Sequence, residues 1–210
     1  MIKSSLIAFL NPTSEVAEQY RTIRNHIRFA SGRDKVGSLV VTSPSGAEGK
    51  SVAAVNLAIT MAQRGDRVLL IDANIRKPVL HVVFNVQSST GLMDVLANKI
   101  EFSSATMKTD IDGLSMLPSG SFLHNSMDLL GTKKMASVLE QAAEHYDAII
   151  LDCSPVLGTP EASDLASRCD GVVLVVNSGK TQQEKAIEAS RTLELVKANI
   201  VGVILNNKKG

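Results

Sequence analysis

The chain has 210 residues, a formal net charge of +1 and a hydrophobic content of 44%. This length is enough for one domain with a full hydrophobic core, so we expect residues 1–210 to form a single domain. A nearly neutral chain gives no reason to expect a nucleic-acid partner. The two cysteines, Cys153 and Cys169, exclude a disulfide framework and fit a reducing cytosol.

The N-terminal stretch "MIKSSLIAFLNP" contains the apolar run "LIAFL", which is too short for a signal peptide or a membrane span. No other run in the sequence approaches the roughly 18 apolar residues of a spanning helix. We therefore expect a soluble, cytoplasmic chain that reaches a membrane only through a partner.

The segment over about residues 13–31, with the sequence "TSEVAEQYRTIRNHIRFA" at its centre, predicts a helix that begins at a capping-type Ser14. Arg21, Arg24 and Arg28 recur at spacings of three and four, so they share one face of this helix. Spacing alone favours a solvated charged face.

The rest of the chain alternates between apolar runs and helical patterns. The runs are rich in Val, Ile and Leu and occupy residues 38–44, 67–73, 114–118, 147–153, 171–177 and 201–207. Continuous apolar runs are typical of parallel strands that are buried on both faces. Helical patterns lie at 51–65, with Gly65 as the expected C-cap, at 131–146 and at 181–198. This alternation predicts an α/β fold, a doubly wound and mostly parallel sheet with helices on both faces.

The segment "SPSGAEGKS" (43–51) follows the first predicted strand and resembles the phosphate-binding loop G-x-x-x-x-G-K-[ST], with Pro44 in place of the leading glycine. We expect its backbone N–H groups to bind phosphate oxygens, as in P-loop NTPases. Lys50 would reach the β- and γ-phosphates, and Ser51 would give its hydroxyl to Mg²⁺. A Gly/Ser turn with a surface lysine is the alternative. The expected nucleotide-binding residues are Ser45, Gly46, Ala47, Glu48, Gly49, Lys50, Ser51 and Val52.

Polar residues at other strand ends complete the candidate site. Asp72 and Asp152 end two apolar runs, where carboxylates line the ligand crevice of a parallel sheet and, with Ser51, suit Mg²⁺. Either acid alone has an alternative role as a helix cap or turn residue. Arg76 adds positive charge at the mouth of the site, and Asn206 can hydrogen-bond an adenine edge. An exposed basic turn and a turn asparagine are the alternatives.

Taken together, residues 12–207 resemble the bacterial tyrosine kinases of capsule and exopolysaccharide systems. The resemblance rests on the loop "SPSGAEGKS", on "LLIDANIRKP" and on "YDAIILDCSPV", in that order. Further matches are "GLMDVL" (91–96), "LPSG" (117–120), "NSMDLL" (125–130) and Asp164 in "PEASDLAS". Partition-type ATPases fit less well, because they typically carry a second lysine early in the loop, where this chain has Ser45.

The resemblance implies phosphoryl transfer from Mg²⁺-bound ATP to protein tyrosines, with Lys50, Asp72, Asp152 and Arg76 as catalytic residues. It also implies that Glu18, Arg21 and Arg24, in "EQYRTIR", assemble subunits into a ring, which reverses the interpretation drawn from spacing alone. In one arrangement of the family the kinase is a separate soluble chain, and the tail of a membrane protein of the polysaccharide chain-length regulator type activates it.

The sequence departs from the family pattern at three places. Asn74 stands where a second aspartate is usual, and "DCSP" (152–155) replaces D-T-P-P. The family's tyrosine cluster is missing, since the only tyrosines are Tyr20 and Tyr146. We expect Cys153 to be a small buried residue and not a nucleophile. These departures leave open a catalytically weakened nucleotide-binding subunit, or a partition-type ATPase.

Overall fold

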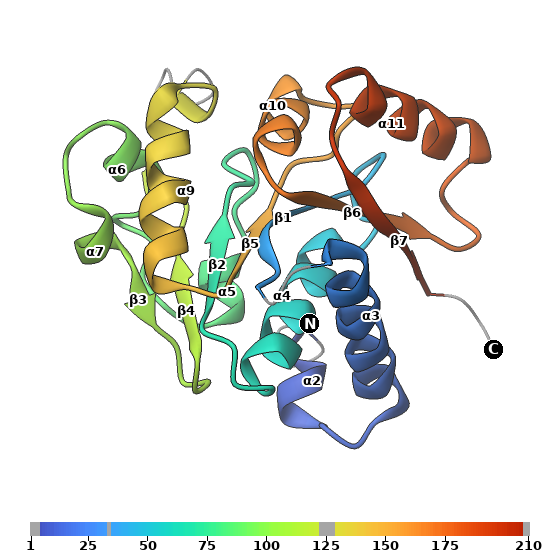
Figure 1. The fold of residues 1–210 in the computed structure, drawn as a ribbon, viewed down its shortest axis with the longest axis horizontal. Coiled ribbons are helices and arrows are strands. Elements are labelled where there is room, and N and C mark those ends of the chain that lie inside the picture. The colour runs from blue at the N-terminus through green and yellow to red at the C-terminus, as the bar shows by residue number, and fades with distance from the viewer. Residues whose placement is uncertain (1–4, 33–34, 122–128, 208–210) are drawn as a thin grey trace.

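The computed structural model describes residues 5–32, 35–121 and 129–207 of the chain. A seven-stranded sheet runs through it in the order β3-β4-β2-β5-β1-β6-β7, with helices on both faces (Figure 1). The strands are β1 (Gly37–Thr42), β2 (Val68–Asp72), β3 (Met107–Lys108), β4 (Leu114–Leu117), β5 (Ala148–Asp152), β6 (Gly171–Asn177) and β7 (Ile200–Asn206). Neighbouring strands are parallel except β3 and β4, so the predicted doubly wound α/β fold is confirmed.

The helices belong to two layers. Helices α2 (Ile7–Leu10), α3 (Glu15–Ser31), α4 (Lys50–Ala62) and α5 (Leu80–Val83) contribute to the hydrophobic core on one face of the sheet. Helices α6 (Leu92–Leu96), α7 (Phe102–Ala105), α9 (Lys133–His145), α10 (Pro160–Arg168) and α11 (Gln183–Leu195) contribute to the core on the other face. Strand residues alternate between the cores: Ile149 and Leu151 of β5 face one, Ala148 and Ile150 the other.

Helix α4 lies at the centre of its layer. Its residues from Ala53 to Ala62 are all buried, because the sheet covers one side and α2 and α3 cover the other. A helix that is apolar nearly all round is stable only in such a position. The side chain of Asn56 fastens α2 to it, accepting from the N–H of Ala8 and donating to the carbonyl of Ser5, both at 2.9 Å. The helix therefore holds its N-terminus, with Lys50 and Ser51, in a rigid place.

Strand register brings three loops to one edge of the sheet. Asp72 of β2 lies beside Asp152 of β5, and Val41 of β1 lies on the other side of Asp152. The chain therefore leaves β1, β2 and β5 at the same carboxyl edge, where ligands of open α/β sheets bind.

Several boundaries differ from the sequence predictions. Helix α4 ends at Ala62, and Gly65, with φ of 103°, ends the turn that follows instead of capping the helix. Short elements without a long periodic pattern, namely α2, α5, α6, α7, α10 and β3, were not predicted. Residues 125–128 of "NSMDLL" lie outside the described residues. Among the helices of the described part of the chain, none is long and apolar enough to cross a membrane.

Candidate nucleotide site

The loop between β1 and α4 has the backbone of an anion-binding cradle. Ala47 and Gly49 both have positive φ, 62° and 93°, which turns successive N–H groups toward one side. Gly49 directly precedes the N-terminus of α4, whose dipole favours negative charge there. Pro44 is buried at the start of the loop, where it needs no N–H to close the turn. The loop is thus preformed for phosphate.

The side chain of Glu48 stabilises the loop between β1 and α4 through two hydrogen bonds. Its Oε2 accepts from the N–H of Ser45 at 3.1 Å, and its Oε1 accepts from the hydroxyl of Thr181 at 2.7 Å. Glu48 is 5% exposed, and both of these bonds are partly buried. The sequence places Glu48 among the predicted nucleotide-binding residues, but this side-chain role was not predictable from it, because Thr181 lies more than a hundred residues away.

Asn206 lies beneath the same loop. Its Nδ2 donates to the carbonyl of Glu48 at 3.0 Å. Gly49 has a φ of 93°, which disfavours other residues, and a Cβ atom there would approach that nitrogen to 2.1 Å and displace the Asn206 amide. The structure therefore places Asn206 in contact with the nucleotide loop, and its expected contact with adenine stays a prediction.

Lys50, Ser51 and Asp152 meet at the end of the loop. The Nζ of Lys50 lies 3.3 Å from Oδ1 of Asp152 and 3.2 Å from Oγ of Ser51. The Asp152 side chain is fully buried and that of Lys50 is 10% exposed. A surface lysine in a Gly/Ser turn would have neither the partner nor the burial, so that alternative does not describe this loop.

The two acids at the carboxyl edge each keep one oxygen unsatisfied. Asp72 Oδ2 accepts from the N–H groups of Val79 and Leu80 at 3.0 Å. Asp72 Oδ1 and Asp152 Oδ2 are buried and have no hydrogen-bond partner among the described residues. Burial, followed by the charge of Asp152, raises the pKa of Asp72 to about 7, and burial raises the pKa of Asp152.

Unsatisfied buried carboxylate oxygens are expensive unless a cation binds them. Two carboxylates and the Ser51 hydroxyl are the oxygen donors that Mg²⁺ prefers, and neighbouring strands hold the acids side by side. The residues present therefore fit a magnesium ion. No group of three or more His, Cys, Asp and Glu residues suited to a metal occurs among the described residues.

Arg76 and Glu161 close one side of the site. The Nη2 of Arg76, in the loop after β2, lies 2.9 Å from Oε1 of Glu161, in the first turn of α10. Glu161 is buried, whereas the Arg76 side chain is 40% exposed. Glu161 was not among the predicted site residues, although Pro160 at the first position of α10 is a sequence signal for a helix start there.

Cys153 follows Asp152 and is fully buried in the core. Burial raises the pKa of its thiol well above the usual value, so the thiol stays protonated. The expectation of a buried and unreactive residue is confirmed.

Comparisons with known proteins agree with this geometry. A family model described as an AAA domain matches residues 38–204. Tyrosine-protein kinase YwqD of Bacillus subtilis is 40% identical over 208 residues, which cover 99% of this chain and 88% of that protein. The chain belongs to the bacterial tyrosine-protein kinase family. Membership of the family and the match to the AAA domain model support the predicted P-loop NTPase fold and nucleotide binding.

Two solved structures resemble this tyrosine-kinase family member closely. The chimerical protein CapA2B2 has a TM-score of 0.94 at 32% identity, covering 99% of this chain and 91% of that one. The kinase domain of the Escherichia coli tyrosine kinase ETK has a TM-score of 0.91 at 27% identity, covering 98% of this chain and 82% of that one.

In this family member two arginines of α3 contact α4 and the turn that follows it. Ser14 caps α3 as predicted, with Oγ accepting from the N–H of Ala17 at 3.2 Å. Arg24 donates to the carbonyl of Thr60 at 2.7 Å, and Arg28 pairs with Asp66 at 3.3 Å.

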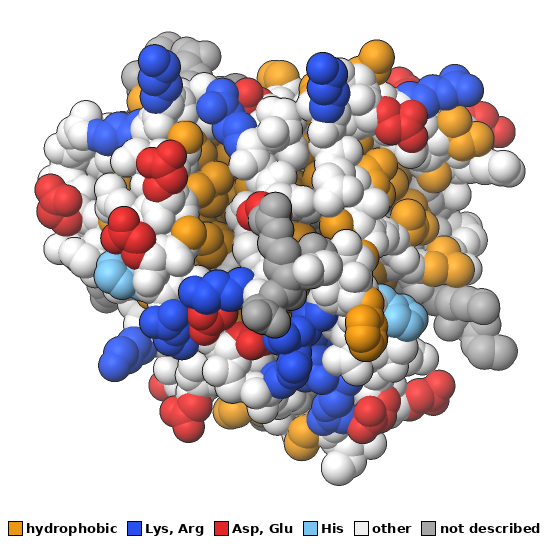
Figure 2. All heavy atoms as spheres, viewed as in Figure 1, with side chains coloured by type: hydrophobic (Ala, Val, Ile, Leu, Met, Phe, Trp, Pro, Cys, Tyr) orange, Lys and Arg blue, Asp and Glu red, His pale blue; other side chains and the backbone are white. Residues whose placement is uncertain are grey.

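Arg21 pairs with Glu18 and donates to the carbonyl of Pro12 at 2.6 Å. Figure 2 shows Lys and Arg side chains gathered over the region of α3 and α4. Burial, and then the neighbouring charge of Arg64, lower the pKa of Arg24. These residues form a basic surface, and its role in ring assembly stays a prediction.

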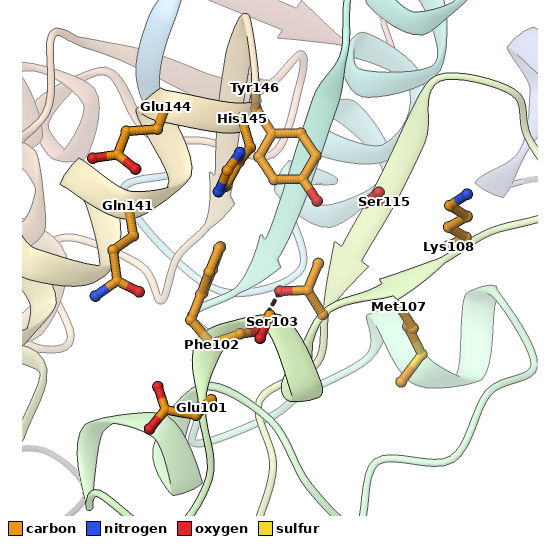
Figure 3. Close-up of a pocket in the computed structure, with 11 residues that line it drawn as sticks. Glu101, Phe102, Ser103, Met107, Lys108, Ser115, Gln141, Glu144, His145 and Tyr146 are labelled. Carbon is orange, nitrogen blue, oxygen red and sulfur yellow. Dashed lines mark hydrogen bonds between the residues drawn. The ribbon is translucent and has the colours of Figure 1, made fainter.

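A hollow of about 450 Å³ lies elsewhere on the kinase-family fold, between α7, β3 and the end of α9. His145 and Tyr146 border it on the α9 side, and Phe102 comes from α7 (Figure 3). The residues that line it include none of the predicted site residues.

Tyr20, the tyrosine that does not border this hollow, is buried in α3, and burial raises its pKa to about 12.

Proposed function

We propose that the chain is a protein-tyrosine kinase that uses Mg²⁺ and ATP and regulates capsular or exopolysaccharide synthesis. One observation carries this proposal: two adjacent buried acids, each with an unsatisfied oxygen, lie beside the lysine of a preformed phosphate loop. Family membership supports tyrosine as the acceptor, since YwqD is named a tyrosine-protein kinase.

Each residue has a role that follows from its surroundings. The loop amides and Lys50 bind the phosphates of ATP, and Ser51 and Asp152 hold Mg²⁺. When bound, the metal neutralises charge on the β- and γ-phosphates. Asp72, whose raised pKa suits a base near neutral pH, accepts the proton of the tyrosine hydroxyl or assists in holding the metal. Arg76 adds positive charge where the γ-phosphoryl group is transferred.

The direct test is transfer of ³²P from γ-labelled ATP to a tyrosine-bearing peptide or protein, with the cytosolic segment of the membrane activator supplied. We expect transfer by the wild type and a loss of at least about 100-fold in Lys50→Met, because that variant lacks the cation that binds the β- and γ-phosphates. A wild type that transfers no more label than Lys50→Met would overturn the proposal.

A second candidate is a nucleotide-binding regulatory subunit without kinase activity. It is favoured by Asn74, which has no carboxylate and whose amide is bound on both sides within the fold. This candidate predicts tight binding of Mg²⁺ and ATP, ring formation and no tyrosine phosphorylation. A partition-type ATPase would instead show steady ATP hydrolysis that DNA or lipid stimulates.

The proposal includes assembly and a partner. Copies of the chain form a ring in which Glu18, Arg21 and Arg24 contact a neighbour, and a membrane protein recruits and activates the cytoplasmic kinase. Replacing Arg21 and Arg24 together by alanine should then convert the assembly to monomers in sedimentation velocity, while nucleotide binding persists. Assembly that is unchanged in this variant would contradict the role of α3.

A further inference from the structure

Two residues that depart from the family pattern, Asn74 and Ser154, contact each other inside the molecule. The Oγ of Ser154 donates to Oδ1 of Asn74 at 3.0 Å, and Nδ2 of Asn74 donates to the carbonyl of Lys77 at 3.0 Å. Asn74 is 6% exposed and Ser154 is 3% exposed. A carbonyl can only accept, so the position facing Lys77 requires an N–H donor, which an amide has and an ionised carboxylate lacks.

This pair belongs to a set of bonds that fixes the loop of residues 73–79. Asp72 Oδ2 joins the two ends of the loop by accepting from Val79 and Leu80, and the N–H of Lys77 donates to the carbonyl of Asn74 at 3.0 Å. The Asn74 side chain thus joins the loop to Ser154 in the segment after β5. It does so alongside the bond from the N–H of Ala73 to the carbonyl of Asp152 at 3.0 Å and the ion pair of Arg76 with Glu161.

The same set reaches the strand that precedes the nucleotide loop. The hydroxyl of Thr42, at the end of β1, donates to the carbonyl of Ser154 at 2.7 Å. The N–H of Val156 donates to the carbonyl of Ser43 at 2.9 Å. The segments after β1, β2 and β5 are therefore joined by buried hydrogen bonds, and Ser154 is the residue that contacts both of the others.

We propose that Asn74 is a positioning residue, and that the Asn74–Ser154 pair fixes the loop of residues 73–79 so that Asp72 and Arg76 face the nucleotide loop in one geometry. An aspartate at position 74 still accepts from Ser154 but repels the carbonyl of Lys77. The structural part of this inference stands without any enzymatic activity, and only its kinetic consequence rests on the proposed kinase function.

Hydrogen exchange of the nucleotide-free protein tests the structural part. Asn74→Asp and Ser154→Ala should each accelerate exchange at the amides of residues 77–80 by about tenfold or more, because each leaves a buried polar group unsatisfied. Ser38→Ala is the matched control. Ser38 is also a buried serine, it donates to Asp170 at 2.8 Å, and it lies at the opposite edge of the sheet. Exchange that is unchanged in both variants, or equally accelerated in the control, overturns the proposal.

The double variant tests whether the two residues act as a pair. Because Asn74→Ala and Ser154→Ala each remove the bond between the two residues, the double variant Asn74→Ala/Ser154→Ala should exchange no more than about threefold faster than the faster of these two single variants. Accelerations that multiply to the product of the two single effects would show independent residues and would contradict the pairing.

Kinetics test the consequence for catalysis. At saturating ATP, Asn74→Asp should lower kcat for tyrosine phosphorylation about tenfold, while the Kd of ADP changes less than about threefold, because the phosphate loop keeps its bonds. A higher kcat in Asn74→Asp would overturn the positioning role and show that a carboxylate at position 74 assists catalysis. A wild type without transfer would refute the kinase function and leave the exchange result valid.

Discussion

Strand β5 has an aspartate at each end, and the two carboxylates have opposite surroundings. Asp147, just before the strand, accepts from the guanidinium of Arg67 at 3.1 Å and pairs with Lys35 at 3.1 Å. Asp152, at the other end, is fully buried and has one cationic partner, Lys50. The bonds from Arg67 lower the pKa of Asp147 below its usual range, whereas burial raises the pKa of Asp152.

The comparison distinguishes Asp147, whose carboxylate stabilises the fold through its cationic partners, from the two carboxylates at the other edge of the sheet, which keep oxygens without a hydrogen bond in the folded chain. At the amino edge of the sheet, Asp147 joins the beginnings of β2 and β5 through Arg67. At the carboxyl edge, Asp72 and Asp152 each keep one buried oxygen that has no hydrogen-bond partner in the described part of the chain. Buried acids with perturbed pKa values concentrate at ligand sites. Removing a negative charge should therefore stabilise the nucleotide-free protein at the carboxyl edge and destabilise it at the amino edge.

Asp72→Asn should give the largest change in stability. The pKa of Asp72 is about 7 in the folded chain, and that of an unfolded aspartate is about 4. Between these values the folded chain binds more protons, so its stability falls as the pH rises from about 4 to about 7. Asparagine removes this loss and still accepts from Val79 and Leu80. Without Mg²⁺, the free energy of unfolding at pH 8 should rise by about 2–4 kcal/mol.

Urea denaturation between pH 4 and pH 8 measures this gain. The gain should be smallest near pH 4, where Asp72 is protonated in the folded wild type and in about half of the unfolded chains. Asp112→Asn, at an exposed loop position, should be neutral across the range. A gain that is equal at all pH values would indicate improved packing, and a loss at pH 8 would contradict the stated cause.

A bound metal ion should offset the loss of stability that the buried carboxylates at the carboxyl edge cause. With ADP and Mg²⁺ at about 100 times their Kd, the wild type should gain about 2.7 kcal/mol of stability. Because Asp72 must release its proton to bind a cation, Mg²⁺ affinity should rise from pH 6 to pH 8. Thermal unfolding with MgCl₂ or EDTA measures both effects. In Asp152→Asn the stabilisation that depends on Mg²⁺ should vanish. If EDTA does not reduce the stabilisation of the wild type by ADP, that result would argue against the metal site.

The sequence predicted the parallel strands and the loop of residues 43–51 because these depend on local patterns. Continuous apolar runs indicate buried strands wherever they occur, and a glycine and lysine before a helix indicate a phosphate loop. The bonds of Glu48 with Thr181 and of Asn74 with Ser154 were not predicted. They join residues 133 and 80 positions apart, and such pairing is fixed by strand order, which periodicity does not contain.

Asp147→Asn should give the smallest change and the opposite sign. Arg67 and Lys35 are more than half exposed, so solvent screens their attraction, and we expect a loss of about 1 kcal/mol at pH 7. Because the folded-state pKa is lowered, this stabilisation is present above about pH 4 and is lost as the pH falls further. Urea denaturation should therefore show a difference in the free energy of unfolding between variant and wild type that becomes smaller in acid. It should also become smaller in 1 M NaCl, where the Debye length is roughly 3 Å and salt screens the attraction. ADP affinity should stay unchanged, because Asp147 lies at the opposite end of β5 from Lys50 and Asp152. A variant that loses ADP affinity, or is as stable as the wild type at pH 7, would break the contrast between the two ends of this strand.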